Sequence, residues 1–155
     1  MSGHRASPDL VRPVAEALRL DYLGAGLPSE AIACGNTTLL ALNKTAVFCS
    51  SRCPGSLIVQ ASDLAHALAD RGATVIGGFH TPVERACLEI LLGGAGPLIV
   101  CPARGMYKTI PVELRRPLAQ GRLLLLSPFD VAERRERAQA LRRHEPQGGQ
   151  ERKDG

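Results

Sequence analysis

The sequence predicts an α/β fold with a doubly wound, mostly parallel sheet. Short apolar segments typical of strands alternate with longer segments whose apolar residues recur every three or four positions, as on one face of a helix. One apolar segment, 123–126, is a run of leucines, which is expected of a parallel strand covered on both faces. Glycine, proline and small polar residues separate these segments and favour tight turns.

The elements are predicted in the following order along the chain. Helical spacing of apolar residues predicts a helix over 8–20, and glycine and proline indicate an irregular connection over 22–33. Strands are then predicted over 46–49, 73–76, 97–101 and 123–126, and helices over 56–70, 82–92 and 110–119. The expected organisation is an N-terminal helix and connection over 1–32, an α/β domain over 33–129, a charged helix over 130–144 and a disordered tail over 145–155.

Composition and charge narrow the classes of function. The chain has 155 residues, of which 45% are hydrophobic, enough for the core of one domain. Only 3% are aromatic, so binding of single strands by several stacked aromatic side chains is poorly supported. The formal net charge of +4 mildly favours anionic partners. No signal pattern is present, and no apolar segment approaches the ~18 residues that cross a bilayer, so we expect a cytoplasmic protein without a membrane partner.

The five cysteines do not form a recognisable metal or disulfide framework. Cys49 and Cys101 lie inside apolar segments, where a free thiol behaves as a small hydrophobe. Three residues separate Cys49 from Cys53, and no paired His or Cys cluster completes a zinc set. We therefore expect reduced and mainly structural cysteines, and neither a metal nor another cofactor.

The segment Gly35–Arg52 contains the first candidate ligand site. The strand predicted over 46–49 ends at Ser50, Ser51 and Arg52, just before a helix that is expected to start near Ser56. Backbone amides at the helix start, the serine hydroxyls and the Arg52 guanidinium could hold a phosphate there. The same residues also suit a simple polar connection with a helix cap, and this segment does not decide between the two interpretations.

A glycine turn follows the second strand of the α/β domain. Gly77 and Gly78 stand between a strand and a helix, where the phosphate loop of a doubly wound sheet lies, although the full G-x-G-x-x-G spacing is missing and a tight turn is the alternative. His80 and Glu84, four residues apart across the helix start, suit either an acid–base pair or a capping arrangement. Glu84 could also position a ribose hydroxyl.

Further cations follow the third strand. Arg104 and Lys108 flank Gly105, and they share the carboxyl edge of the sheet with Arg52 if all the strands are parallel. The three cations would then converge on one crevice that binds phosphate. The alternative is three independent, solvated surface charges.

The order and spacing of these motifs resemble the DprA/Smf DNA-processing proteins over 33–129. The family has a Gly-Asn pair, two leucines and a strand ending in Gly-Ser-Arg, and its second motif, Ser-Gly-Leu-Ala-x-Gly-Ile-Asp, is similar to 77–84. The matching residues are Gly35, Asn36, Leu39, Leu40, Ser50, Ser51 and Arg52, with Ser50 in place of the family's glycine, and then Gly77, Gly78 and Glu84, followed by Gly93, Gly94, Gly105 and Met106.

This resemblance implies a Rossmann-like, three-layer α/β/α domain that binds single-stranded DNA without sequence specificity and is not an enzyme. It implies DNA processing in natural transformation with a recombinase as partner; a homodimer is also expected. The implied phosphate contacts come from Ser51 and Arg52, from the backbone at Gly77 and Gly78, and from Arg104, Gly105 and Lys108. The Phe-Pro-x-Arg-Asn-Arg motif with which the family usually continues is not present here.

Two other functions fit the same residues. The first is a nucleotide-binding carrier or sensor that uses the same crevice without chemistry. The second is an enzyme similar to the nucleoside-monophosphate phosphoribohydrolases of the wider lysine-decarboxylase-like group, whose Pro-Gly-Gly-x-Gly-Thr loop is followed by a glutamate. Here 93–97, Gly-Gly-Ala-Gly-Pro, lacks the threonine and precedes a strand, and Glu84 is the residue that favours an enzyme.

Overall fold

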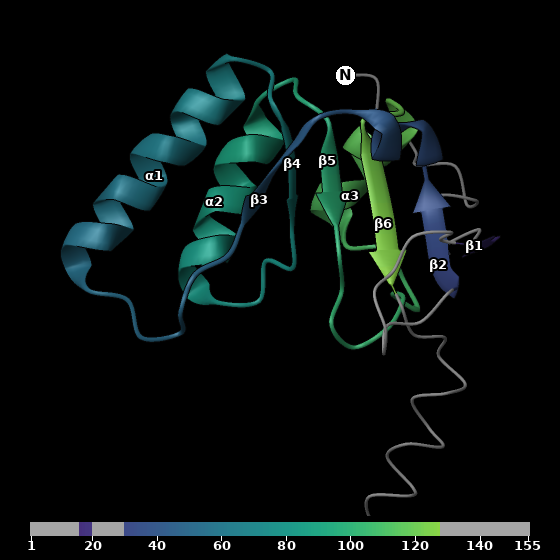
Figure 1. Ribbon diagram of the computed structural model, residues 1–155, viewed down its shortest axis with the longest axis horizontal. Coiled ribbons are helices and arrows are strands. Elements are labelled where there is room, and N and C mark those ends of the chain that lie inside the picture. Colours follow the sequence, from purple (N-terminus) through teal and green to yellow (C-terminus); the bar gives the residue numbers. More distant parts are fainter. Residues whose placement is uncertain (1–15, 20–29, 128–155) are drawn as a thin grey trace, which may run out of the picture.

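The computed structural model describes residues 16–19 and 30–127, which form one mixed sheet with helices (Figure 1). The strands are β1 (Glu16–Arg19), β2 (Glu30–Gly35), β3 (Lys44–Val47), β4 (Thr74–Gly77), β5 (Leu98–Val100) and β6 (Leu123–Ser127), in the spatial order β1-β2-β6-β5-β4-β3. The helices are the 3-10 helix η2 (Thr37–Ala41) and the α-helices α1 (Gly55–Asp70), α2 (Pro82–Gly93) and α3 (Val112–Ala119). β3, β4, β5 and β6 are parallel, and β2 is antiparallel to both β6 and β1.

The three α-helices pack on one face of the sheet. Each connects two neighbouring parallel strands, and every step along the sheet runs in the same direction from β3 to β6. Because such crossovers are right-handed, successive steps in one direction place their helices on the same face. The larger core cluster confirms this placement, since Leu68 of α1, Leu91 of α2 and Leu114 of α3 belong to it together with buried strand residues such as Val75 and Leu98.

The opposite face of the sheet carries a smaller core cluster. Ile99 and Leu124 are fully buried there, and Leu39 of η2 packs with them. The prediction of an α/β fold with a mostly parallel sheet is confirmed. Among the described residues, however, the α-helices form a single layer, because the order of the parallel strands never reverses. The opposite face of the sheet packs against the 3-10 helix η2.

The predicted elements between residues 46 and 126 are all present, shifted at their ends by two residues or fewer. Two predictions nearer the N-terminus were wrong. Residues 16–19, predicted as the end of a helix, form β1, and residues 30–33, predicted as irregular connection, belong to β2. β2 is secured by pairing with distant backbone, as between Ile32 and Ser127, and β1 pairs with β2 in turn. Local spacing of apolar residues does not reveal such pairing. The helix and tail predicted over 130–155 lie outside the described residues.

Gly35 and Asn36, at the end of β2, connect β2 to the start of β6. Gly35 has a φ of 113°, and a Cβ there would collide with the carbonyl oxygen of Leu123. The backbone amide of Asn36 donates to that Leu123 oxygen over 3.1 Å, and its side-chain Nδ2 donates to the Gly121 oxygen over 2.7 Å. Leu123 begins β6, so this pair lies at the amino edge of the parallel strands and serves the fold.

Candidate functional site

The candidate site lies at the carboxyl edge of the parallel strands. β3, β4 and β5 run in the same direction, so the loops that follow them leave from one edge of the sheet. The loops after β4 and β5, with the starts of α2 and α3, surround a hollow of about 940 Å³. Its lining comprises Gly78, Phe79, His80, Arg85, Leu88, Pro102, Ala103, Arg104, Gly105, Met106, Tyr107, Lys108, Pro111, Glu113 and Leu114.

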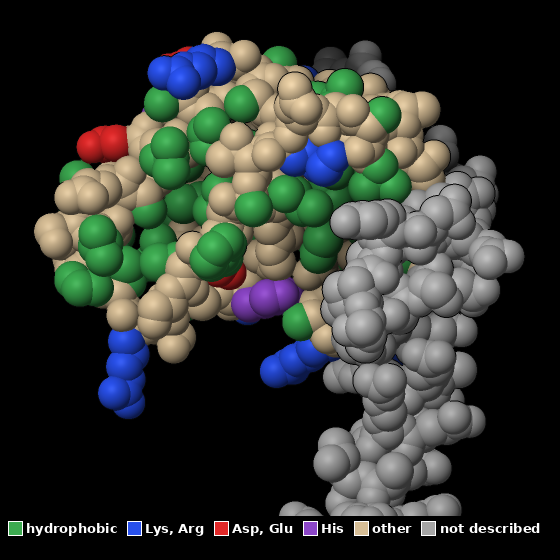
Figure 2. All heavy atoms as spheres, in the orientation of Figure 1, with side chains coloured by type: hydrophobic (Ala, Val, Ile, Leu, Met, Phe, Trp, Pro, Cys, Tyr) green, Lys and Arg blue, Asp and Glu red, His purple; other side chains and the backbone are tan. Residues whose placement is uncertain are grey.

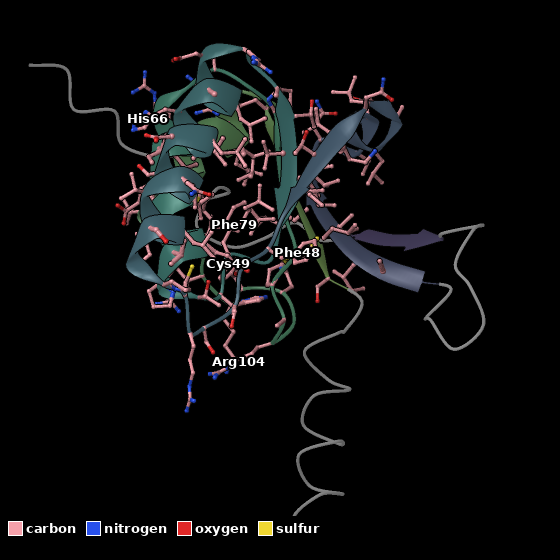
Figure 3. The ribbon with its side chains drawn as sticks, turned by 60° about the vertical axis from the view of Figure 1, so that its left-hand side comes forward. Phe48, Cys49, His66, Phe79 and Arg104 are labelled. Atoms are coloured by element: carbon pink, nitrogen blue, oxygen red, sulfur yellow. The ribbon has the colours of Figure 1, made fainter. Side chains whose placement is uncertain are left out.

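Several of the predicted site residues meet at this hollow. Gly78 and His80 come from the loop after β4, and Arg104, Gly105 and Lys108 come from the loop after β5. In Figure 2 the carboxyl edge of the sheet faces downward. Blue Lys and Arg side chains project from the lower side of the molecule, where a purple histidine side chain also lies. In Figure 3, Arg104 lies at the same end of the molecule as Phe48 and Cys49, and His66 lies toward the other end.

Arg85 also lines the hollow, and we did not single it out from the sequence. It belongs to the first turn of α2, directly after the capping residue Glu84. This position beside the glycine turn is the sequence feature that could have identified Arg85 as a site residue. Tyr107 lies close to it: burial, and then the charge of Glu113, raise the pKa of Tyr107, while Arg85 opposes them. The Tyr107 hydroxyl is therefore neutral at ordinary pH, and the lining contains three Lys or Arg side chains against one carboxylate.

The segment Ser50–Arg52 lies outside this hollow. All three residues are exposed on the loop between β3 and α1, and the Arg52 backbone amide donates to the Ser50 Oγ over 3.3 Å. α1 begins at Gly55 after Pro54, with no side-chain hydrogen bond capping its first turn. Arg104 and Lys108 line the hollow, but Arg52 does not, so the three cations do not share this hollow as predicted.

Glu84 joins two loops of the carboxyl edge. Its Oε1 accepts from the Cys49 amide over 2.6 Å, and its Oε2 accepts from the amides of His80 and Thr81 over 2.7 and 3.2 Å. The Thr81 hydroxyl accepts in turn from the Glu84 amide, which completes a capping box. Burial would raise the pKa of Glu84, but these three amides and the nearby His80 outweigh burial and lower it.

The capping arrangement is thus the one that the structure contains. Glu84 is 5% exposed and does not line the hollow. Its contact with His80 runs through the His80 backbone amide, and the carboxylate has no accessible position from which to take a proton from a substrate.

The glycine turn after β4 is tightly packed. A Cβ on Gly77 would come within 2.7 Å of the Val47 oxygen, and one on Gly78 would collide with the His80 imidazole. Phe79, buried beside them, has a φ of 54°, which a non-glycine residue rarely adopts. The two glycines therefore let the chain turn closely against β3, and Gly78 contributes to the lining of the hollow.

The described residues add two negative findings. Across 16–19 and 30–127, no three His, Cys, Asp or Glu side chains are grouped so that they could hold a metal ion. No helix in the same part of the chain has the length and apolar character needed to cross a membrane.

The chain matches no known protein-family model and no curated protein. Its structure is similar to a solved structure of DNA processing protein A from Helicobacter pylori. That structure was described for its single-stranded DNA binding mode. The TM-score is 0.51 at 20% sequence identity, over 74% of this chain and 56% of that one, so this chain spans little more than half of the solved chain's length. The likeness shows the fold, a Rossmann-like α/β domain.

Proposed function

We propose that the chain binds single-stranded DNA without sequence specificity, through phosphate contacts at the carboxyl edge of its sheet. The observation that carries this proposal is the set of cations around one hollow, Arg85, Arg104 and Lys108, with a single carboxylate, Glu113, opposing them. Arginine holds phosphate oxygens in a bidentate manner and lysine attracts them as a point charge. Contacts of this kind do not depend on the base sequence.

The loop after β3 extends the proposed phosphate track beyond the hollow. Ser50, Ser51 and Arg52 are exposed there, and the start of the long helix α1, whose first turn has no side-chain cap, follows directly. Phe48, on the same loop, is 85% exposed, which suits a base that stacks on its ring. The structural likeness to a single-stranded DNA-binding protein supports the same function.

The enzyme alternative has less support from the site. The phosphoribohydrolase reaction would need an accessible glutamate, and the Glu84 carboxylate is committed to three backbone amides. The glycine-rich segment 93–97 precedes β5, so it lies at the amino edge of the sheet. Arg122 holds it there by donating to the oxygens of Leu92 and Gly96 over 2.7 and 3.0 Å.

A titration of a fluorescent oligo-dT strand, followed by anisotropy, tests the proposal. Affinity should fall steeply with salt, with a slope of about −0.7 per phosphate contact, and a nucleoside monophosphate should not displace the strand. Displacement by the monophosphate at micromolar concentration would favour the nucleotide carrier or sensor. Failure to bind the strand at low salt would overturn DNA binding altogether.

The wider role is a second part of the proposal. We infer a DNA-processing function in the cytoplasm during natural transformation, with a recombinase and a second copy of the chain as partners. Recombinase filament assembly on single-stranded DNA, measured with and without the chain, tests the first partner, and sedimentation equilibrium tests the second. An unchanged assembly rate, or a monomer at all concentrations, would remove that partner.

A further inference from the structure

Two thiols face each other at the two ends of the Ser50–Arg52 segment. The Sγ atoms of Cys49 and Cys53 are 3.4 Å apart, and neither is in a disulfide. A disulfide requires these atoms to approach to about 2.05 Å, a small change for a loop. Both cysteines are partly exposed, so a small reagent can reach them.

The loop ends are held in place on both sides of this pair. The Cys49 amide donates to Glu84, which belongs to α2. Cys53 precedes Pro54, whose carbonyl oxygen accepts from Leu57 and Ile58 in the first turn of α1. The two thiols are therefore presented to each other by separate, fixed elements, and the residues between them are the ones that must adjust.

The other cysteines are placed differently. Cys34 and Cys87 are buried, and the Cys87 thiol donates to the Ala61 oxygen over 3.6 Å. Burial raises the pKa of the Cys87 and Cys101 thiols, which lowers the fraction of reactive thiolate. The hydrogen bond with Cys49, and then burial, raise the pKa of Cys53, which lowers the fraction of thiolate at Cys53.

We propose that Cys49 and Cys53 are a redox modification site, at which a low-molecular-weight disulfide such as oxidised glutathione converts the two thiols into an intramolecular disulfide. The Cys49 thiolate attacks one sulfur of the oxidant, forms a mixed disulfide and releases one small thiolate. Cys53 then loses its proton and displaces the second small thiolate. Two protein thiols are oxidised and one small disulfide is reduced to two thiols.

The disulfide would close a ring over Ser50, Ser51 and Arg52. A ring this small restricts the backbone of all three residues, so it changes how their amides, hydroxyls and guanidinium can reach a phosphate. This regulatory consequence rests on the proposed function, whereas the formation of the disulfide does not. The two are therefore measured separately.

The first measurement equilibrates the full chain with reduced and oxidised glutathione, traps free thiols by alkylation and maps the peptides by mass. We expect Cys49 joined to Cys53 while Cys34, Cys87 and Cys101 are alkylated. The folded chain should favour the disulfide at least about tenfold more than the chain unfolded in guanidinium, because folding holds the sulfurs together. The proposal would be overturned if the disulfide formed equally readily in the folded and the unfolded chain, or if glutathione remained attached to Cys49.

Two variants sharpen this measurement. Cys53→Ser should accumulate the mixed disulfide at Cys49, because the second displacement is blocked. Cys101→Ser, a matched change elsewhere, should leave the Cys49–Cys53 equilibrium unaltered. A Cys53→Ser protein that takes up no glutathione at Cys49 would contradict the assigned order of attack.

The second measurement compares oligo-dT binding by the oxidised and reduced forms. The affinity should differ between the two forms in the unaltered chain and not in Cys53→Ser. Equal affinities of two forms that both bind would reject regulation by this site. Absence of DNA binding in both forms would reject the proposed function, and the disulfide measured by mass would still stand.

Discussion

The Oε1 of Glu84 accepts a hydrogen bond of 2.6 Å from the backbone amide of Cys49. A carboxylate at the start of α2 thereby holds the loop that follows β3, although the two residues belong to different strand–helix units. Since its second oxygen accepts from His80 and Thr81, one buried side chain sets the relative positions of two loops at the candidate site.

Replacing Glu84 by Gln should lower the free energy of unfolding by about 1–3 kcal/mol, since a buried amide is left without its acceptor. The glutamine side chain has one oxygen for donors on both sides, and its NH₂ would face a backbone N–H. Urea denaturation measures the change. Glu89→Gln, an exposed position on the same helix, is the control and should change stability little. Equal effects of the two changes would contradict this role of Glu84.

The lowered pKa of Glu84 predicts a pH dependence of stability. Because the folded value lies below the ordinary value of 4.5, the stabilisation is fully present above about pH 4.5 and is lost as the pH falls through the folded value. Urea midpoints at a series of pH values from neutral to acidic should therefore decline in the unaltered chain. The Glu84→Gln chain should decline less over the same range, and parallel curves would show that other groups cause the loss.

Gly77→Ala should destabilise the fold by about 1–3 kcal/mol, the usual effect of overpacking. The added Cβ meets the backbone oxygen of Val47, which cannot move without shifting β3. Gly93→Ala serves as the comparison, because a Cβ there meets nothing within 4 Å, and it should change stability by less than about 0.5 kcal/mol. Thermal melts of both variants are sufficient, and a neutral Gly77→Ala would mean that β3 yields easily.

Arg104→Ala and Lys108→Ala should each weaken oligo-dT binding and reduce the magnitude of the salt slope by about 0.7, the value for one phosphate contact on a single strand. Arg71→Ala removes the same charge as Arg104→Ala from the C-cap of α1, away from the hollow, and should leave the slope unchanged. Anisotropy titrations at four or more salt concentrations give the slopes. If all three variants behaved alike, net charge and not the hollow would govern binding.

The sequence predicts the part of the fold between β3 and β6. From β3 to β6 every strand pairs with the next one along the chain, and the apolar spacing of α2 indicates the face that it buries. In α1 the spacing predicts the helix but not its buried face, because Leu57, Ile58 and Leu64 are exposed there and Ala65 and Leu68 are buried. The strand character of β2 depends on pairing with β6, far along the chain, and β1 in turn pairs with β2, so the apolar spacing of neither segment indicates a strand.

The candidate site divides in the same way. The sequence places Gly78, Arg104 and Lys108 at one edge, because each follows a parallel strand. It does not show that Glu84 would turn inward to Cys49, since a capping glutamate and a catalytic one have the same spacing from the preceding turn. Nor does it separate Arg52 from the other cations, because the length of a loop does not determine its direction.

The position of β2 between β1 and β6 has a consequence for biosynthesis. β2 leaves the ribosome before any of the parallel strands, yet its inner partner, β6, is the last to be made of the strands that the structure describes. Until residue 127 has emerged, β1 is the partner that β2 has among the described strands, and a two-stranded ribbon is marginal in water. A nascent chain that stalls within α3 therefore carries both early strands without the partner that secures them.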